Sequence, residues 1–365
     1  MSNTEQKTDA RRIPVSFMAI DSYVETHIVA PTETIARGTD GRYRWGQEDK
    51  YPAYLMGLYD DCTTLRSVID GCVDFIAGDD VIFEGVRDRK MNGDGENIVD
   101  VVRQAAFNLK LYGGFALEII RAVGGGIAEI RCLDLKNIRT NKKNDVFWYS
   151  EKWGSARCDY EEIPLFMAEE DQKRSLLFVK MGRSGIYPAP CFAAAVKACE
   201  IERNIDDFHL SNMQNGFTAS AVVSFNNGPA EDQQEEEIEK NFNEKFSGHS
   251  NAGRIIFAWA SDKDHAVTVE QLKAENFGEQ YEALAKRSRQ AIFTAFRANP
   301  TLFGIPTESL GFSSEEYEAA FKLFNRTQVR PCQKLIADAF AKIYGSAVLQ
   351  IVPFTLDGNS ETVVN

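Results

Sequence analysis

The stretch GEQYEALAKRSRQAIFTAFRANPTLFGIPTESLGFSS, from Gly278 to Ser314, contains a long amphipathic helix that ends abruptly. Its apolar residues recur at helical spacing: Tyr281, Leu284, Ala285, Ile292, Ala295 and Phe296. The helix is predicted to end at Asn299-Pro300, because the residue before a proline is disfavoured in the α-helical region. The loop from Thr301 to Gly311 then carries several large apolar residues: Leu302, Phe303, Ile305 and Leu310. An apolar loop between two helices indicates either that the loop is buried or that it contacts a partner.

Basic residues accompany this helix: Lys286, Arg287, Arg289 and Arg297. Positions 286, 289 and 293 share a helical face, and Phe293 occupies the third position, so the basic stripe is short. Two interpretations of the stripe remain open. One is ion pairing with Glu279 or Glu282 or with a neighbouring subunit, and the other is contact with nucleic-acid phosphates.

The composition is that of a soluble globular protein. The chain has 365 residues, of which 44% are hydrophobic and 26% charged, enough for two or three domains. No run of eighteen apolar residues is present, so no transmembrane helix is expected. The N-terminus is polar and lacks the apolar core of a secretory signal, which predicts synthesis in the cytosol.

The net charge of −13 argues against a sequence-specific DNA-binding protein. Such a protein needs a basic face that neutralises phosphates. An acidic protein that surrounds DNA without gripping it is still compatible with this charge, because an acidic wall repels phosphate and leaves the polyanion mobile.

The sequence predicts no metal, no cofactor and no catalytic residue. The seven cysteines are widely spaced without a CxxC pair, and the four histidines form no HExxH motif, so a zinc site is not expected. Neither a P-loop nor a GxSxG elbow occurs. The side chains of Asp60 and Asp61 diverge on a predicted helix, and Asp79-Asp80 follows a helix end.

Helices and strands follow one another in a clear order. Helices are predicted from Pro52 to Asp79 and from Asn97 to Tyr112, and hairpins at 115–133 and 138–149. Further strands are predicted at the following ranges: 81–83, 175–181, 217–225, 254–260, 266–269 and 347–354. The helix 230–246 is acidic, and this charge is interpreted as either a solvated face or a face toward a lumen or partner.

Several short segments have patterns that occur together in one known family. They are Trp45-Gly46 before Tyr51-Pro52 at a helix entry, Leu111-Tyr112-Gly113-Gly114 leading into a strand that ends at Arg121, Asn251-Ala252-Gly253-Arg254 before an apolar strand, and the helix and loop from Arg289 to Gly311. In this order, over roughly Trp45 to Tyr344, the chain resembles the portal (head–tail connector) proteins of tailed bacteriophages in their compact, siphophage-like form. The last segment departs from the family's Phe-Gly-Val-Pro-Pro-x-x-Leu-Gly signature, because Ile305-Pro306 comes later and Asn299-Pro300 is extra.

The resemblance implies an α+β portal-like subunit. It would have an α+β wing, two long stem helices flanking a small β-α-β clip, and a long C-terminal helix kinked at Pro331. The implied segments are an N-terminal arm (1–45), the first part of the wing (46–187), a stem helix (188–216), the clip (217–271), a second stem helix (272–298), a tunnel loop (299–313), a kinked wing or crown-side helix (314–345), and a terminal strand and tail (346–365).

The resemblance also assigns roles to residues. The DNA channel would be faced by Arg297, Asn299, Thr301, Leu302, Phe303, Thr307 and Glu308. The clip would dock an adaptor through Glu235, Glu236, Glu239 and Phe242. The basic residues Lys286, Arg287 and Arg289 would contact phosphates or a neighbouring subunit.

The implied function is structural and not enzymatic. Family members form a ring, usually a dodecamer, at the capsid vertex of the virion after assembly in the host cytoplasm. The ring is a passive conduit for double-stranded DNA during packaging and ejection, without sequence specificity. Its implied partners are a terminase motor, a head–tail adaptor, and capsid and scaffold proteins. No contact with a membrane is implied.

Two other functions remain open. One is a soluble metal-dependent enzyme that uses the carboxylates of Asp60, Asp61, Asp79 and Asp80. The other is a non-portal scaffold or adaptor protein that binds its partner through the acidic helix 230–246.

Overall fold

The computed structural model describes residues 29–36, 41–155, 158–168, 172–182, 185–214, 222–225, 256–259, 277–305 and 314–355. The chain divides into two compact units. The larger unit comprises His27–Arg203 and Leu284–Asn365, and the smaller comprises Met1–Thr26 and Asn204–Ala283. Among the described helices, none has the length and apolar character needed to cross a membrane.

Three helices form the centre of the larger unit. They are α1 (Tyr51–Asp61), α2 (Thr63–Ala77) and α3 (Ile98–Leu111). The Asn97 side chain and Asp100 form a reciprocal capping box at the start of α3, which confirms the helix predicted there. The prediction of one continuous helix from Pro52 to Asp79 is wrong, because Cys62 has extended backbone angles (φ −100°, ψ 106°) that separate α1 from α2.

The physical reason for this break lies far along the chain. The Thr64 backbone N–H and hydroxyl both donate to Glu202 Oε1, at 3.0 and 2.7 Å. Glu202 belongs to α4 (Val196–Gln214). A carboxylate from another element therefore supplies the cap at the start of α2, and no local residue pattern signals it.

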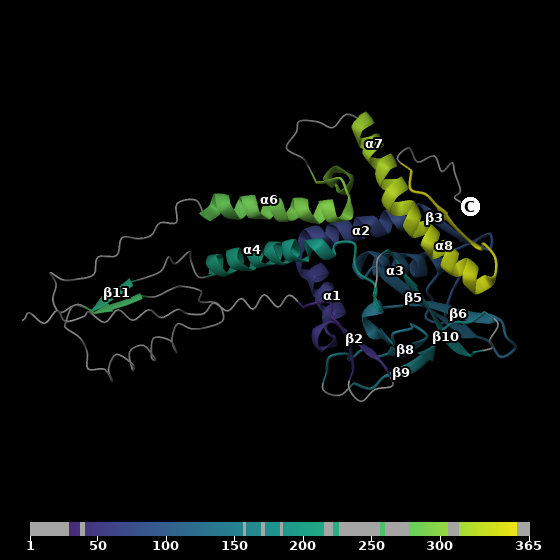
Figure 1. Ribbon diagram of the computed structural model, residues 1–365. Helices are drawn as coiled ribbons and strands as arrows, with labels where there is room; N and C mark the ends of the chain where they lie inside the picture. The colour runs from purple at the N-terminus through teal and green to yellow at the C-terminus, as the bar shows by residue number, and fades with distance from the viewer. Residues whose placement is uncertain are drawn as a thin grey trace, which may run out of the picture. The chain divides into compact units, whose positions relative to one another are not determined.

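An antiparallel sheet packs against α3. Its strands lie in the order β10 (Arg174–Lys180), β5 (Gly114–Arg121) and β6 (Ile127–Leu133). Figure 1 shows α3 beside β5 and β6. The predicted glycine-rich hairpin between β5 and β6 is confirmed, and so is the strand predicted at 175–181, which pairs with β5.

A second antiparallel sheet contains β7 (Ile138–Thr140), β8 (Val146–Tyr149) and β9 (Glu161–Pro164). The predicted hairpin of β7 and β8 is confirmed, and β9 was not predicted. Beside it, β1 (Glu33–Ile35) pairs with β2 (Tyr43–Trp45). The described end of the segment 1–45 therefore contains regular structure that its weak periodicity did not indicate.

A buried ion pair joins these two small sheets. Asp49 follows β2, and its carboxylate accepts from the Arg139 Nε and, at 2.7 Å, from Arg42. Arg139 is 1% exposed and donates further to the carbonyls of Asp49, Lys136 and Ile138. The two guanidinium groups share the Asp49 carboxylate, so each charged group lies beside a group of opposite charge, which lowers the free-energy cost of burying it.

The C-terminal part of the larger unit is a long interrupted helix. Its segments are α7 (Ser314–Phe324), the π-helical turn η6 (Asn325–Val329) and α8 (Arg330–Tyr344), which follow one another in Figure 1. The interruption predicted at Pro331 lies in the turn just before it. Proline has no N–H and its ring crowds the carbonyl four residues back, and a π-helical turn is one way in which a helix absorbs this.

The chain then forms the strand β13 (Leu349–Val352), which confirms the predicted terminal strand. It pairs antiparallel with β3 (Asp80–Phe83), the strand predicted at 81–83, and β3 pairs in turn with β4 (Val86–Arg87). The Gln333 amide of α8 donates to the Ile76 carbonyl at 3.1 Å. These contacts fix the C-terminal segment to the end of α2.

The smaller unit contains two described strands, β11 (Val222–Phe225) and β12 (Ile256–Trp259). They pair in parallel, and a parallel pair needs a crossover connection. This agrees with the predicted β-α-β order, although the predicted helix 230–246 and strand 266–269 lie outside the described residues. In the same unit, the rings of Phe208 on α4 and Tyr281 on α6 (Phe277–Phe296) stack at 4.9 Å.

Candidate functional site

The candidate site begins where α6 ends. The helix stops at Phe296, three residues before the predicted Asn299. Arg297 has left-handed backbone angles (φ 52°), its N–H donates to the Thr294 carbonyl, and the Ala298 N–H donates to the Phe293 carbonyl, both at 3.0 Å. These two bonds form a Schellman motif, in which glycine usually occupies the left-handed position. The motif ends the helix before Pro300 can do so, and places an exposed arginine at its end.

A tight turn follows this helix end. The Asn299 carboxamide oxygen accepts from the Thr301 N–H at 3.1 Å, and residues Pro300–Phe303 form a 3₁₀ helix, η5. The turn closes at Gly304, which is left-handed (φ 73°), and the Ile305 N–H donates back to the Pro300 carbonyl at 3.2 Å. Asn299 therefore acts as a helix cap, and the first half of the predicted tunnel loop is an ordered turn.

The apolar residues of the turn point into their own subunit. Leu302 is 8% exposed, and the Phe303 ring packs on Gly71 of α2 and among other phenylalanine rings. Both side chains therefore pack on their own subunit, and their predicted position in a channel wall stays a prediction. The physical reason is that the aromatic cluster of α2, α6 and α7 offers these side chains a dry site within the subunit.

The end of α6 is fixed by similar packing. Ile292, Phe293 and Phe296 are almost fully buried, and the Phe296 ring stacks on Phe192 at 5.5 Å. The position of the turn after α6 is therefore defined by the core of the larger unit.

The predicted basic residues all lie on the surface. Lys286, Arg287 and Arg289 are exposed on α6, as is Arg297 after it. Within the described part of the chain, Arg287, Arg289 and Arg297 have no carboxylate partner, so the predicted ion pair with Glu282 does not form with either α6 arginine. Their charges are available to a phosphate or to another subunit.

Arg287 lies at the edge of a shallow groove of about 380 Å³. The groove runs between α6 and the 3₁₀ turn η3 (Ala193–Ala195) that precedes α4. Most of its lining is small side chains, Ala194, Ala195, Ala291, Thr294 and Ala295, and Gln290 lies beside them. Small residues at helical spacing allow the close approach of a second backbone.

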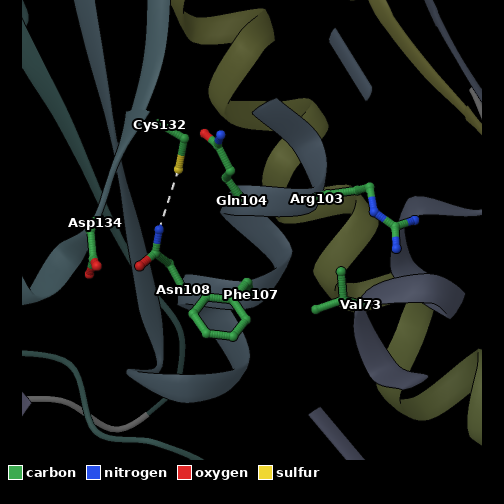
Figure 2. A pocket seen from close by; sticks show the side chains of 7 residues that line it. All are labelled: Val73, Arg103, Gln104, Phe107, Asn108, Cys132 and Asp134. Carbon is green, nitrogen blue, oxygen red and sulfur yellow. Dashed lines mark hydrogen bonds between the residues drawn. The ribbon is translucent and has the colours of Figure 1, made fainter. Parts of the chain in front are cut away.

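A second pocket, of about 460 Å³, lies between α2, α3 and β6 (Figure 2). Its Asn108 side chain is fully used: the amide donates to Cys132 Sγ at 3.5 Å and to the Leu133 carbonyl, and its oxygen accepts from the Leu135 N–H. Burial raises the pKa of the Cys132 thiol to about 12, so this sulfur stays protonated and is a poor nucleophile. The lining provides no nucleophile with an adjacent base.

Three of the four carboxylates proposed for a metal-dependent enzyme have separate structural partners. Asp61 lies 3.5 Å from Arg203, Asp80 lies 2.6 Å from Arg87, and Asp79 accepts from the Thr355 N–H. Among the described residues, no group of three or more histidine, cysteine, aspartate or glutamate side chains is arranged to hold a metal ion.

Some predicted site residues lie outside the described residues. They are Thr307 and Glu308 of the tunnel loop and Glu235, Glu236, Glu239 and Phe242 of the clip. Other residues were missed by the sequence analysis, notably Gly71 and Glu202. A glycine in the middle of a broad apolar helix face was a signal for Gly71, because glycine is disfavoured there without a packing reason. No comparable signal marked Glu202.

The family described as "Phage portal protein" matches residues 94–356, well over half of the chain. The chain belongs to the phage portal protein family. Its place is therefore the portal ring at the vertex of the capsid, and neither the metal-dependent enzyme nor the non-portal scaffold is favoured.

The fold of this portal protein is also found in solved structures. A chain of the virion of a native gene transfer agent particle has 17% identity, with 82% of each chain covered and a TM-score of 0.52. A chain of the neck of a native particle, computed with C12 symmetry, has 15% identity, covers 90% of this portal protein and 87% of its own length, and gives a TM-score of 0.53. No curated protein sequence matches significantly.

Proposed function

We propose that this portal protein forms a closed ring through which double-stranded DNA passes without sequence specificity during packaging and ejection. The observation that carries the proposal is the family match over residues 94–356. The ordered turn after α6 adds to it, because Arg297 is exposed there without a described carboxylate partner.

The channel is faced by the polar side of this turn. We assign Arg297 and Thr301 to the channel wall, with Asn299 as the cap that holds the turn. Thr307 and Glu308 follow on the same loop and belong to the same proposal. Leu302 and Phe303 pack within the subunit, and their position in the channel wall stays a prediction. A net charge of −13 suits a conduit. An acidic wall makes few strong contacts with phosphates, so the DNA is not held back as it moves.

The basic stripe on α6 is assigned to contacts between subunits. Arg287 borders the small-residue groove beside η3, and Arg289 lies two residues further along. A ring places such a surface against the next copy of the chain, and twelve copies is the number that the family resemblance implies.

The remaining partners are those that the family resemblance implies. The chain has no P-loop, so a separate terminase ATPase drives the DNA. The head–tail adaptor docks on the clip through Glu235, Glu236, Glu239 and Phe242. Capsid and scaffold proteins contact the ring during assembly in the host cytoplasm. The portal protein itself is not an enzyme.

A packaging assay tests the conduit. A phage whose own portal gene is inactivated is complemented with this chain or with Arg297→Glu, and the DNA retained in purified heads is measured. The proposal predicts heads of normal shape with less DNA for the variant. Equal DNA content for both would contradict the assignment of Arg297 to the channel.

A further inference from the structure

Gly71 forms a notch in the surface of α2. A Cβ atom at this position would lie 2.6 Å from Cδ1 and 2.8 Å from Cε1 of Phe303. Real Cβ contacts are essentially never shorter than 3.0 Å. The Phe303 ring therefore occupies the space that any other residue at position 71 would fill.

Three further rings surround Phe303. Phe75 of α2 lies at 6.0 Å, Phe293 of α6 at 5.8 Å, and Phe324 of α7 at 5.7 Å between ring centroids. All three contacts are edge-to-face, at interplanar angles of 81°, 61° and 88°. This is a favoured arrangement of aromatic rings, so these contacts define the orientation of the Phe303 ring in addition to burying it among apolar side chains. One side chain thus joins the turn to three helices.

Hydrogen bonds hold the backbone on both sides of Phe303 in place. Backbone bonds link Arg297 to Thr294, Ala298 to Phe293, and Ile305 to Pro300, and Asn299 caps the 3₁₀ helix that ends at Phe303. The first two bonds hold the exposed Arg297 at the end of α6, and the others hold the turn from Asn299 to Ile305 that follows it directly, so fixing Phe303 fixes this turn next to Arg297.

We propose that Phe303 is the positioning residue of the tunnel loop, and that the glycine notch at Gly71 is its socket on α2. The socket holds the exposed side of the turn at one place relative to the wing. The role of the loop in the channel rests on the proposed function. The packing of Phe303 on Gly71 is independent of that function.

Hydrogen exchange of the purified full-length protein, followed by mass spectrometry over residues 297–305, tests the socket. Gly71→Ala fills the notch and must expel the ring. The amides of 297–305 are then expected to exchange at least about tenfold faster, because local opening of the turn becomes easier. Gly57→Ala on α1 is the matched control, since nothing lies within 4 Å of the added Cβ there, and it is expected to leave these amides unchanged.

Two further variants keep the test decisive if Gly71→Ala weakens α2. Phe303→Ala removes the ring without crowding the helix and must speed exchange over the same residues. In the Gly71→Ala background, Phe303→Leu must restore part of the protection, because a smaller side chain fits the filled notch. Unchanged exchange in Phe303→Ala, or no restoration by Phe303→Leu, overturns the socket.

Ring formation is measured on the same samples by native mass spectrometry. Rings that persist while residues 297–305 exchange faster support a positioning role and not a general structural one. Absence of rings in the wild-type protein would contradict the proposed function, and the exchange comparison would still decide the socket. The two failures are therefore distinguishable.

Discussion

At the scale of single residues, the burial of Arg139 and Asp49 is a demanding packing problem. Both side chains are nearly inaccessible, and the guanidinium is satisfied by the Asp49 carboxylate and by three backbone carbonyls. Removal of Asp49 leaves the buried Arg139 charge uncompensated, whereas removal of Arg139 leaves Asp49 with Arg42 and the Trp45 N–H.

Arg139→Met is expected to lower the free energy of unfolding by about 2–3 kcal/mol, because Asp49 loses its most buried partner and keeps Arg42 and the Trp45 N–H. Urea unfolding followed by tryptophan fluorescence measures this loss. Arg289→Met, at an exposed position, is the control and is expected to stay within about 0.5 kcal/mol of the wild type. Equal stability of the two variants would show that the network contributes nothing.

The exposed arginines are expected to affect assembly and not folding. Arg289→Glu places a negative charge on the surface assigned to the next subunit, and the fraction of protein in rings is expected to fall about tenfold. Size-exclusion chromatography with light scattering measures that fraction. Lys142→Glu, in the exposed turn between β7 and β8, is the matched charge reversal. If both variants assemble normally, the stripe on α6 is only solvated.

At the scale of elements, the start of α2 depends on a cap from α4. Glu202→Ala removes the acceptor for the Thr64 N–H and hydroxyl, and a loss of about 1–2 kcal/mol is expected. The amides of the first turn of α2 are expected to exchange faster than those of α3. Asp206→Ala, an exposed position on the same helix, serves as the comparison. Unchanged exchange at Thr64 and Leu65 would refute the cap.

This cap also shows what the sequence could predict and what it could not. The hairpins around Gly124–Gly126 and Asn141–Asp145 were predictable, because their turn residues and alternating strands are neighbours in the chain. The break at Cys62 was not, because its stabilising carboxylate is 138 residues away from Thr64. A local residue pattern predicts the structure of its own segment. It contains no information about a partner that lies far away in the sequence.

The same distinction applies to the candidate site. The sequence placed a helix end, an apolar loop and an arginine near Pro300, and it left open whether the loop is buried or meets a partner. The socket at Gly71 answers this for Leu302 and Phe303, which pack within the subunit. That answer required knowledge of which helices lie beside the turn, and the amphipathic pattern of α6 does not contain it.

At the scale of the whole molecule, the features fit a part of a larger assembly. The surface of the larger unit carries unpaired arginines and exposed apolar side chains such as Ile201, Leu284 and Leu323. Single exposed apolar residues are ordinary on monomers, but here they accompany a family match to portal proteins. A ring offers these side chains the neighbours that one subunit lacks.

The central claim is that this chain assembles into a closed ring with a hole wide enough for double-stranded DNA. Native mass spectrometry of the purified protein, with negative-stain microscopy of the same sample, tests it most directly. The account predicts a dominant closed oligomer with a stained central hole, of twelve subunits as the family resemblance implies. A stable monomer at micromolar concentration, at both low and high salt, would contradict it.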